Sequence, residues 1–92
     1  MMASFRQDYL DLLDGRVAKI AGLVDAAETE PAVVALLSLE SSSSMAGAHD
    51  LAAAGRRLRD ALGTPGVDLT PLTAQLSAEA ATARDRLAPG TA

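Results

Sequence analysis

Residues 36–51, with the sequence LLSLESSSSMAGAHDL, decide the fold that we expect of this chain. Leu36, Leu39 and Ser43 recur at three- and four-residue steps, which is the spacing of one face of an α-helix. Gly47 then stops this helix or turns the chain, because glycine readily adopts the backbone conformation that ends many helices. A second apolar stripe follows at once. The stretch therefore predicts two helices joined by a tight corner, with a serine-rich surface on the first.

The rest of the chain has the same helical periodicity, and no segment alternates as a β-strand would. Ser4 and Gln7 have the spacing of a capping box at the start of the first helix. Pro31 and Pro71 suit the first turns of the second and fourth helices. We predict helices at about residues 4–27, 31–46, 48–62 and 70–87. This pattern is typical of an all-α, antiparallel up-and-down four-helix bundle, with residues 1–92 as a single domain.

Composition narrows the classes of function. The chain has 92 residues, no cysteine and one histidine, which excludes disulfide frameworks and zinc sites built on thiolates or several histidines. A net charge of −4 argues against a nucleic-acid partner. No apolar run approaches the roughly 20 residues of a membrane span, and the N-terminus lacks the layout of a signal peptide. We therefore expect a cytoplasmic protein with no cofactor, no metal, no nucleic acid and no membrane among its partners.

The central segment also resembles the signature of histidine phosphotransfer (HPt) domains, which runs roughly His-x-Leu-Lys-Gly-Ser-Ser-x-x-x-Gly-Ala-x-x-Leu. Six residues of this frame are present at the family's spacing: Leu39, Ser42, Ser43, Gly47, Ala48 and Leu51. The same alignment puts Leu37 at the phosphohistidine position, Glu40 at the lysine and Ser41 at the first glycine. Leucine has no nitrogen to phosphorylate, and a carboxylate repels a phosphoryl group. The resemblance therefore implies an HPt-like bundle that lacks the phospho-accepting residue.

The resemblance covers nearly the whole chain and implies a signalling module of a two-component phosphorelay. Its partner would be a response-regulator receiver domain or a histidine kinase, docked on the first and second helices. Because nothing at the usual position can carry phosphate, the module would act by binding, and we do not expect an enzyme. Helical periodicity independently puts Leu37 on the solvent side of its helix. The predicted partner-binding face consists of Val33, Leu37, Glu40, Ser41 and Ser44.

Two other interpretations stay open. The chain could be a structural or interaction bundle unrelated to phosphorelay, with a homodimer burying more apolar surface than a thin Ala/Leu core provides. It could also be a phosphotransfer enzyme that uses His49, the only imidazole, beside Asp50. Against the latter, His49 falls at a corner between helices, about 12 residues beyond the family's phosphorylation position. A solvent-exposed histidine at a helix N-terminus is the simpler expectation.

Two smaller groups of residues have structural interpretations. The aromatic residues Phe5 and Tyr9 are expected to anchor the first helix in the core, since aromatic side chains bury large apolar areas. Arg56, Arg57 and Arg59 are close in sequence but do not share one helical face. We therefore expect them to form a solvated surface and not a phosphate-binding patch.

Overall fold

The computed structural model describes the backbone of residues 2–87 and the side chains of residues 5–87, and this part of the chain contains four α-helices and no β-strand. The helices are α1 (Met2–Asp25), α2 (Thr29–Met45), α3 (His49–Leu62) and α4 (Thr70–Leu87). The predicted all-α bundle is confirmed, and the bounds of α4 match at both ends. α1 already begins at Met2, so Ser4 lies inside the helix and does not cap it; its side chain falls outside the described ones.

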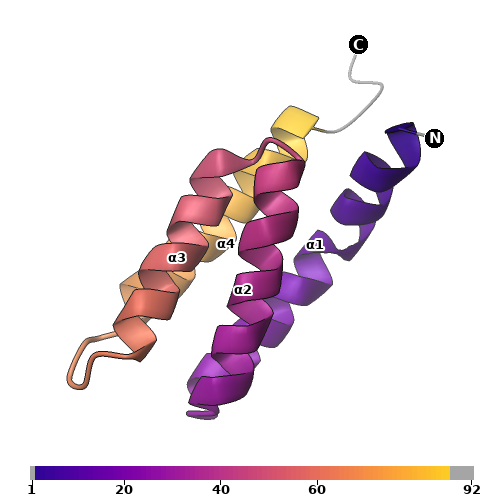
Figure 1. Ribbon diagram of the computed structural model, residues 1–92. Helices are drawn as coiled ribbons and strands as arrows, with labels where there is room; N and C mark the ends of the chain where they lie inside the picture. Colours follow the sequence, from indigo (N-terminus) through magenta and orange to yellow (C-terminus); the bar gives the residue numbers. More distant parts are fainter. Residues whose placement is uncertain (1, 88–92) are drawn as a thin grey trace.

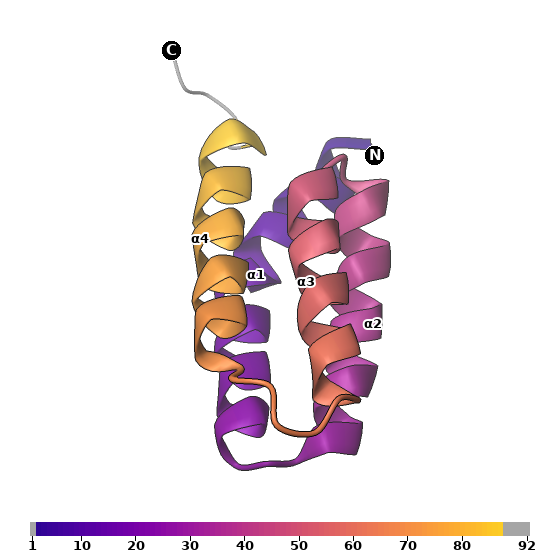
Figure 2. The same ribbon diagram turned by 90° about the vertical axis from the view of Figure 1, so that its left-hand side faces the viewer.

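Each helix contacts two of the other three. α1 and α3 both pack against α2 and α4. The start of α1, the corner between α2 and α3, and the end of α4 lie at one end of the bundle, and the other two connections lie at the opposite end (Figures 1 and 2). α2 therefore runs between α1 on one flank and α3 on the other.

The core is built from aliphatic side chains contributed by all four helices. Its largest fully buried members are Leu13, Ile20, Leu36, Leu39, Leu51, Leu58 and Leu76. Each such side chain contributes about 1.5–3 kcal/mol through removal of apolar surface from water. Tyr9 is buried with them, as expected, but Phe5 is 42% exposed, so its predicted anchoring role is wrong. Four residues advance a helix by about 40°, which turns Phe5 away from the core relative to Tyr9.

The corner between α2 and α3 fixes the end of the serine-rich helix. Gly47 has φ +85°, the left-handed conformation that glycine adopts without steric cost. The backbone N–H of Ala48 donates to Ser43 O (2.8 Å) and that of Gly47 to Ser44 O (3.1 Å). These two bonds form the Schellman pattern, which satisfies carbonyls that a helix end otherwise leaves unpaired. Gly47 thus ends the helix where the sequence predicts.

Candidate functional site

The predicted partner-binding face lies on the outer side of α2. Leu37 is 47% exposed in the middle of the helix, as its position in the periodic pattern predicts. Ser41 and Ser44 are also exposed, whereas Val33, one turn before Leu37, is half-buried. The centre of this face is therefore an exposed leucine bordered by two small hydroxyl-bearing residues.

Glu40 is expected to face solvent, but its side chain turns toward α3 instead. Its carboxylate accepts two hydrogen bonds from Arg59 of α3, from Nε to Oε2 at 2.7 Å and from Nη2 to Oε1 at 3.1 Å, and the glutamate side chain is only 16% exposed. Such a bidentate pair fixes both side chains in one geometry. The hydrogen bonds with Glu40 raise the pKa of Arg59 further above its ordinary value, so the guanidinium stays charged. The expectation that Arg59 belongs to a purely solvated surface is also wrong, whereas Arg56 and Arg57 are exposed.

A glycine of α3 lies against the side chain of Glu40. A Cβ atom placed at Gly55 would lie 3.3 Å from Glu40 Cγ, which is closer than most side-chain contacts allow, and at an ordinary contact distance of 3.7 Å from Leu36 Cδ2. Gly55 is buried, and its missing side chain leaves room for the stem of Glu40 across the surface of α3. The close approach of α2 and α3 thus holds the carboxylate beside Arg59.

The partner-binding face borders α3. At about 100° per residue, Val33, Leu37, Glu40 and Ser44 fall within about 60° of one another around α2. Glu40, a member of this group, contacts α3 through Arg59. These four residues therefore lie on the side of α2 nearer to α3, and docking of a partner on α1 and α2 stays a prediction.

The opposite flank of α2 meets α1 through different residues. Arg16 of α1 donates from Nη2 to Ser38 Oγ (2.6 Å) and from Nη1 to Ser42 Oγ (3.3 Å). A guanidinium that is bound to two neutral hydroxyls keeps its full positive charge. The α1 flank of α2 is therefore cationic and hydroxyl-rich, unlike the neutralised ion pair on the α3 flank.

A buried polar pair lies just inside that flank. The hydroxyls of Tyr9 and Ser43 share a hydrogen bond of 2.7 Å, and both side chains are almost fully enclosed. Burial raises the pKa of Tyr9 above its ordinary value, against the smaller opposing effects of the Ser43 hydrogen bond and the positive charge of Arg16. The sequence places Ser43 and Tyr9 separately on core-facing stripes but does not reveal that they meet. A serine on an apolar stripe is the signal that a buried partner must exist.

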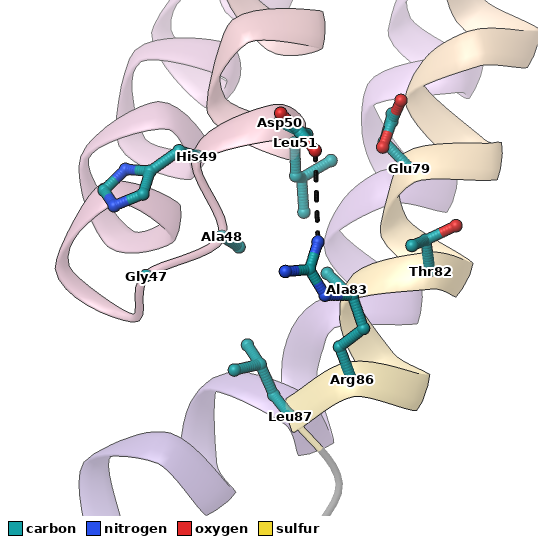
Figure 3. A pocket seen from close by; sticks show the side chains of 10 residues that line it. All are labelled: Gly47, Ala48, His49, Asp50, Leu51, Glu79, Thr82, Ala83, Arg86 and Leu87. Atoms are coloured by element: carbon teal, nitrogen blue, oxygen red, sulfur yellow. Dashed lines mark ion pairs between the residues drawn. The ribbon is translucent and has the colours of Figure 1, made fainter.

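A small pocket opens at the end of the bundle where the α2–α3 corner meets the last turns of α4 (Figure 3). Its volume is about 290 Å³. The lining residues are Gly47, Ala48, His49, Asp50, Leu51, Glu79, Thr82, Ala83, Arg86 and Leu87. Asp50 and Arg86 face one another across it at 4.0 Å, and both side chains are largely exposed. An exposed ion pair at this distance contributes little to stability.

His49 lies at the edge of this pocket. It is the first residue of α3 and is exposed, as expected of a histidine at a helix N-terminus. Its ring points away from the pair formed by Asp50 and Arg86 (Figure 3). In the described part of the chain, no group of three or more His, Cys, Asp or Glu side chains is arranged to hold a metal ion.

Comparisons with known proteins find no match: no protein-family model, no curated protein and no solved structure matches the chain. None of the four helices, as far as residues 2–87 describe them, has both the length and the hydrophobicity needed to cross a membrane. The geometry of α2 and its two flanks is therefore the basis for a functional proposal.

Proposed function

We propose that the chain is an HPt-like signalling module of a two-component phosphorelay that lacks the phospho-accepting histidine. Its partner is a response-regulator receiver domain or a histidine kinase, which docks on the face formed by Val33, Leu37, Glu40, Ser41 and Ser44. The module acts by occupying its partner. The fold that accompanies this proposal is an antiparallel up-and-down bundle of the HPt type.

The exposure of Leu37 is the observation that carries the proposal. The HPt-like alignment puts the family's phosphohistidine at this position, and the residue there must reach solvent for a partner to meet it. Leu37 is 47% exposed at mid-helix, so a partner can reach its side chain. Apolar side chains at a solvent surface favour protein contacts once a partner covers them.

The surroundings of Leu37 favour binding without phosphotransfer. Glu40, at the family's lysine position, is a carboxylate that occupies Arg59, so neither residue offers a free positive charge to a phosphoryl group. Ser41 and Ser44 are small and exposed and allow a partner's backbone to approach closely. An apolar centre with small polar neighbours resembles the anchor-and-rim arrangement of protein interfaces.

The arrangement of the helices is compatible with this proposal but does not distinguish it from other bundles. Consecutive helices pack side by side, and α1 closes the ring against α4. Many unrelated proteins have four helices in this order, so fold alone carries little functional information. The sequence frame from Leu39 to Leu51 and the exposure of Leu37 provide the more specific support.

A binding assay tests the proposal. Titration of the chain into a panel of receiver domains and kinase cytoplasmic domains should find at least one partner. Leu37→Glu should weaken that interaction at least about tenfold, which corresponds to 1.4 kcal/mol. Val67→Glu is the matched control, because Val67 is 41% exposed in the loop before α4 and lies outside the face. No binding across the panel, or equal binding by Leu37→Glu and wild type, would rule the proposal out.

A gain-of-function variant tests the alignment itself. Leu37→His in a His49→Ala background places one imidazole at the family's phosphorylation position. We expect this variant to take up acid-labile phosphate from an autophosphorylated kinase with its receiver, whereas wild type and Leu37→Gln do not. Label on wild type that disappears in His49→Ala would instead support the alternative enzyme that uses His49.

A further inference from the structure

The outer side of the α1–α2 pair carries most of the exposed apolar bulk of the molecule. Of the six exposed large hydrophobic side chains in the described part of the chain, four lie there: Phe5 (42%), Leu12 (60%), Val34 (67%) and Met45 (74%). A shallow groove lined by Arg16, Lys19, Val34 and Ser38, among others, runs between the two helices. Concentration of apolar side chains on one side of a small domain indicates an interaction surface.

On α1, the residues of this side are arranged symmetrically. Phe5, Asp8, Leu12, Arg16 and Lys19 follow one another at steps of three, four, four and three residues, with Leu12 at the centre. If an identical helix packs antiparallel on this stripe, Leu12 meets its own copy. Asp8 then lies opposite Arg16, and Phe5 lies opposite Lys19. The first pairing joins opposite charges, and the second places a cation near an aromatic ring.

On α2, the residues of the same side have a symmetric order of their own. Val34, Ser38, Ser41 and Met45 follow one another at steps of four, three and four residues, with the centre between the two serines. An antiparallel copy places Val34 opposite Met45 and Ser38 opposite Ser41. Apolar side chains thus meet apolar ones, and hydroxyls meet hydroxyls.

The two centres lie at nearly the same level along the bundle. The Tyr9–Ser43 and Arg16–Ser38 hydrogen bonds connect α1 to α2 on either side of both centres. These two bonds show which residues of α1 and α2 lie at the same height along the bundle. Interpolating between them, at a rise of 1.5 Å per residue, puts Leu12 about 2 Å along the bundle axis from the midpoint of Ser38 and Ser41. A single twofold axis that crosses both helices can therefore generate both sets of pairings at once.

Three charged side chains on this side have no oppositely charged partner among the residues that the structure describes. Arg16 donates only to the hydroxyls of Ser38 and Ser42. In the described residues, neither Asp8 nor Lys19 forms an ion pair. A second copy supplies the opposite charge to Arg16 and Asp8 simultaneously, as a self-complementary twofold interface requires.

From these observations we propose that the chain forms an antiparallel homodimer through the outer side of α1 and α2, with Leu12 on the twofold axis. This dimer is independent of the proposed signalling function. It leaves Leu37 and the Glu40–Arg59 pair on the α3 flank outside the central contacts. Ser41 is the one residue of the partner-binding face that takes part in these pairings, whereas Val33, Leu37, Glu40 and Ser44 take part in none of them.

Cysteine crosslinking tests the geometry directly, since the chain contains no cysteine. Under mild oxidation, Leu12→Cys should give a disulfide-linked dimer because residues on a twofold axis meet their own copies. An equimolar mixture of Val34→Cys and Met45→Cys should crosslink far more than either variant alone. Val67→Cys, in the loop before α4, should stay largely monomeric. Equal crosslinking of Leu12→Cys and Val67→Cys would overturn the proposal.

Sedimentation equilibrium tests the energetics without a crosslink. Wild type should be in monomer–dimer equilibrium, and Leu12→Glu should raise the dimer Kd at least about tenfold by placing two carboxylates at the axis. Val67→Glu and Leu37→Glu should keep the wild-type Kd. Circular dichroism checks that every variant is folded, which is expected because Leu12 is 60% exposed. A wild type that is still monomeric at about 1 mM, or an unchanged Kd in Leu12→Glu, would overturn the proposal.

Discussion

The two flanks of α2 differ in how tightly they pack against the neighbouring helix. We call the α3 flank the closed flank and the α1 flank the open flank. Toward α3, the helix is in close contact, with Gly55 beneath the stem of Glu40 and Arg59 held by its carboxylate. Toward α1, Arg16 joins the helices through serine hydroxyls, and the neighbouring apolar side chains are left in solvent. The closed flank leaves a single exposed leucine, whereas the open flank leaves a row of exposed apolar residues.

This difference shows how one polar run can serve several roles. Ser43 is buried against Tyr9, Ser42 accepts a hydrogen bond from Arg16, and Ser41 and Ser44 are exposed. Consecutive residues of a helix point in directions about 100° apart, so four serines in a row meet the core, one neighbouring helix and solvent. The run is thus neither a linker nor one uniform surface.

The largest effect is expected from breaking the closed flank. Gly55→Leu should lower the free energy of unfolding by about 1–3 kcal/mol, because the added side chain forces α2 and α3 apart. Gly22→Leu is the matched control, since nothing lies within 4 Å of a Cβ at this exposed position of α1. There the same change should stabilise the helix by up to about 1 kcal/mol. Urea denaturation measures both, and a loss of equal size at the two positions would show that the closed flank has no special packing.

The buried polar pair beside the open flank should give the next effect. Ser43→Ala leaves the Tyr9 hydroxyl without its partner, which should cost roughly 1–3 kcal/mol of unfolding free energy. Ser44→Ala is the matched control, because this hydroxyl is exposed, and its removal should change stability by less than about 0.5 kcal/mol. If Ser43→Ala is as stable as wild type in urea denaturation, the Tyr9–Ser43 bond does not stabilise the fold.

A smaller change in the free energy of unfolding is expected when the pH is raised. The pKa of Tyr9 is raised above its ordinary value of 10.0, so the folded state holds the phenolic proton more tightly than the unfolded state. Stability from this group is complete below about pH 10 and is lost as pH rises through the folded-state pKa. Urea midpoints measured from pH 8 to pH 11 should fall more in wild type than in Tyr9→Phe. If the urea midpoints of the two proteins fall in parallel with pH, the pKa of Tyr9 is the same in the folded and unfolded states.

The smallest effect on stability is expected at Leu37. Leu37→Glu should change the free energy of unfolding by no more than about 0.5 kcal/mol, because the side chain is exposed and has no buried polar partner. Thermal unfolding followed by circular dichroism measures this. A loss above about 2 kcal/mol would mean that Leu37 is part of the packed core and not of a binding face.

The helices could be predicted from the sequence because their signals are local. Gly47 ends α2 through its left-handed backbone, and Pro71 lies in the first turn of α4 as expected. The partner of Glu40 could not be predicted, since Arg59 is 19 residues away and their contact depends on how closely α2 and α3 approach. Phe5 and Tyr9 lie on the same periodic stripe, so only the packed structure distinguishes the exposed ring from the buried one.

We assign receiver binding to the face around Leu37 and dimer formation to the side around Leu12. The most direct test measures both kinds of binding in one variant of each surface. Receiver-domain binding and the monomer–dimer Kd would each be determined for Leu37→Glu and Leu12→Glu. We expect Leu37→Glu to lose receiver binding and keep the dimer, and Leu12→Glu to lose the dimer and keep receiver binding. Receiver binding by Leu37→Glu at wild-type affinity would contradict the claim that Leu37 is the centre of the partner-binding face.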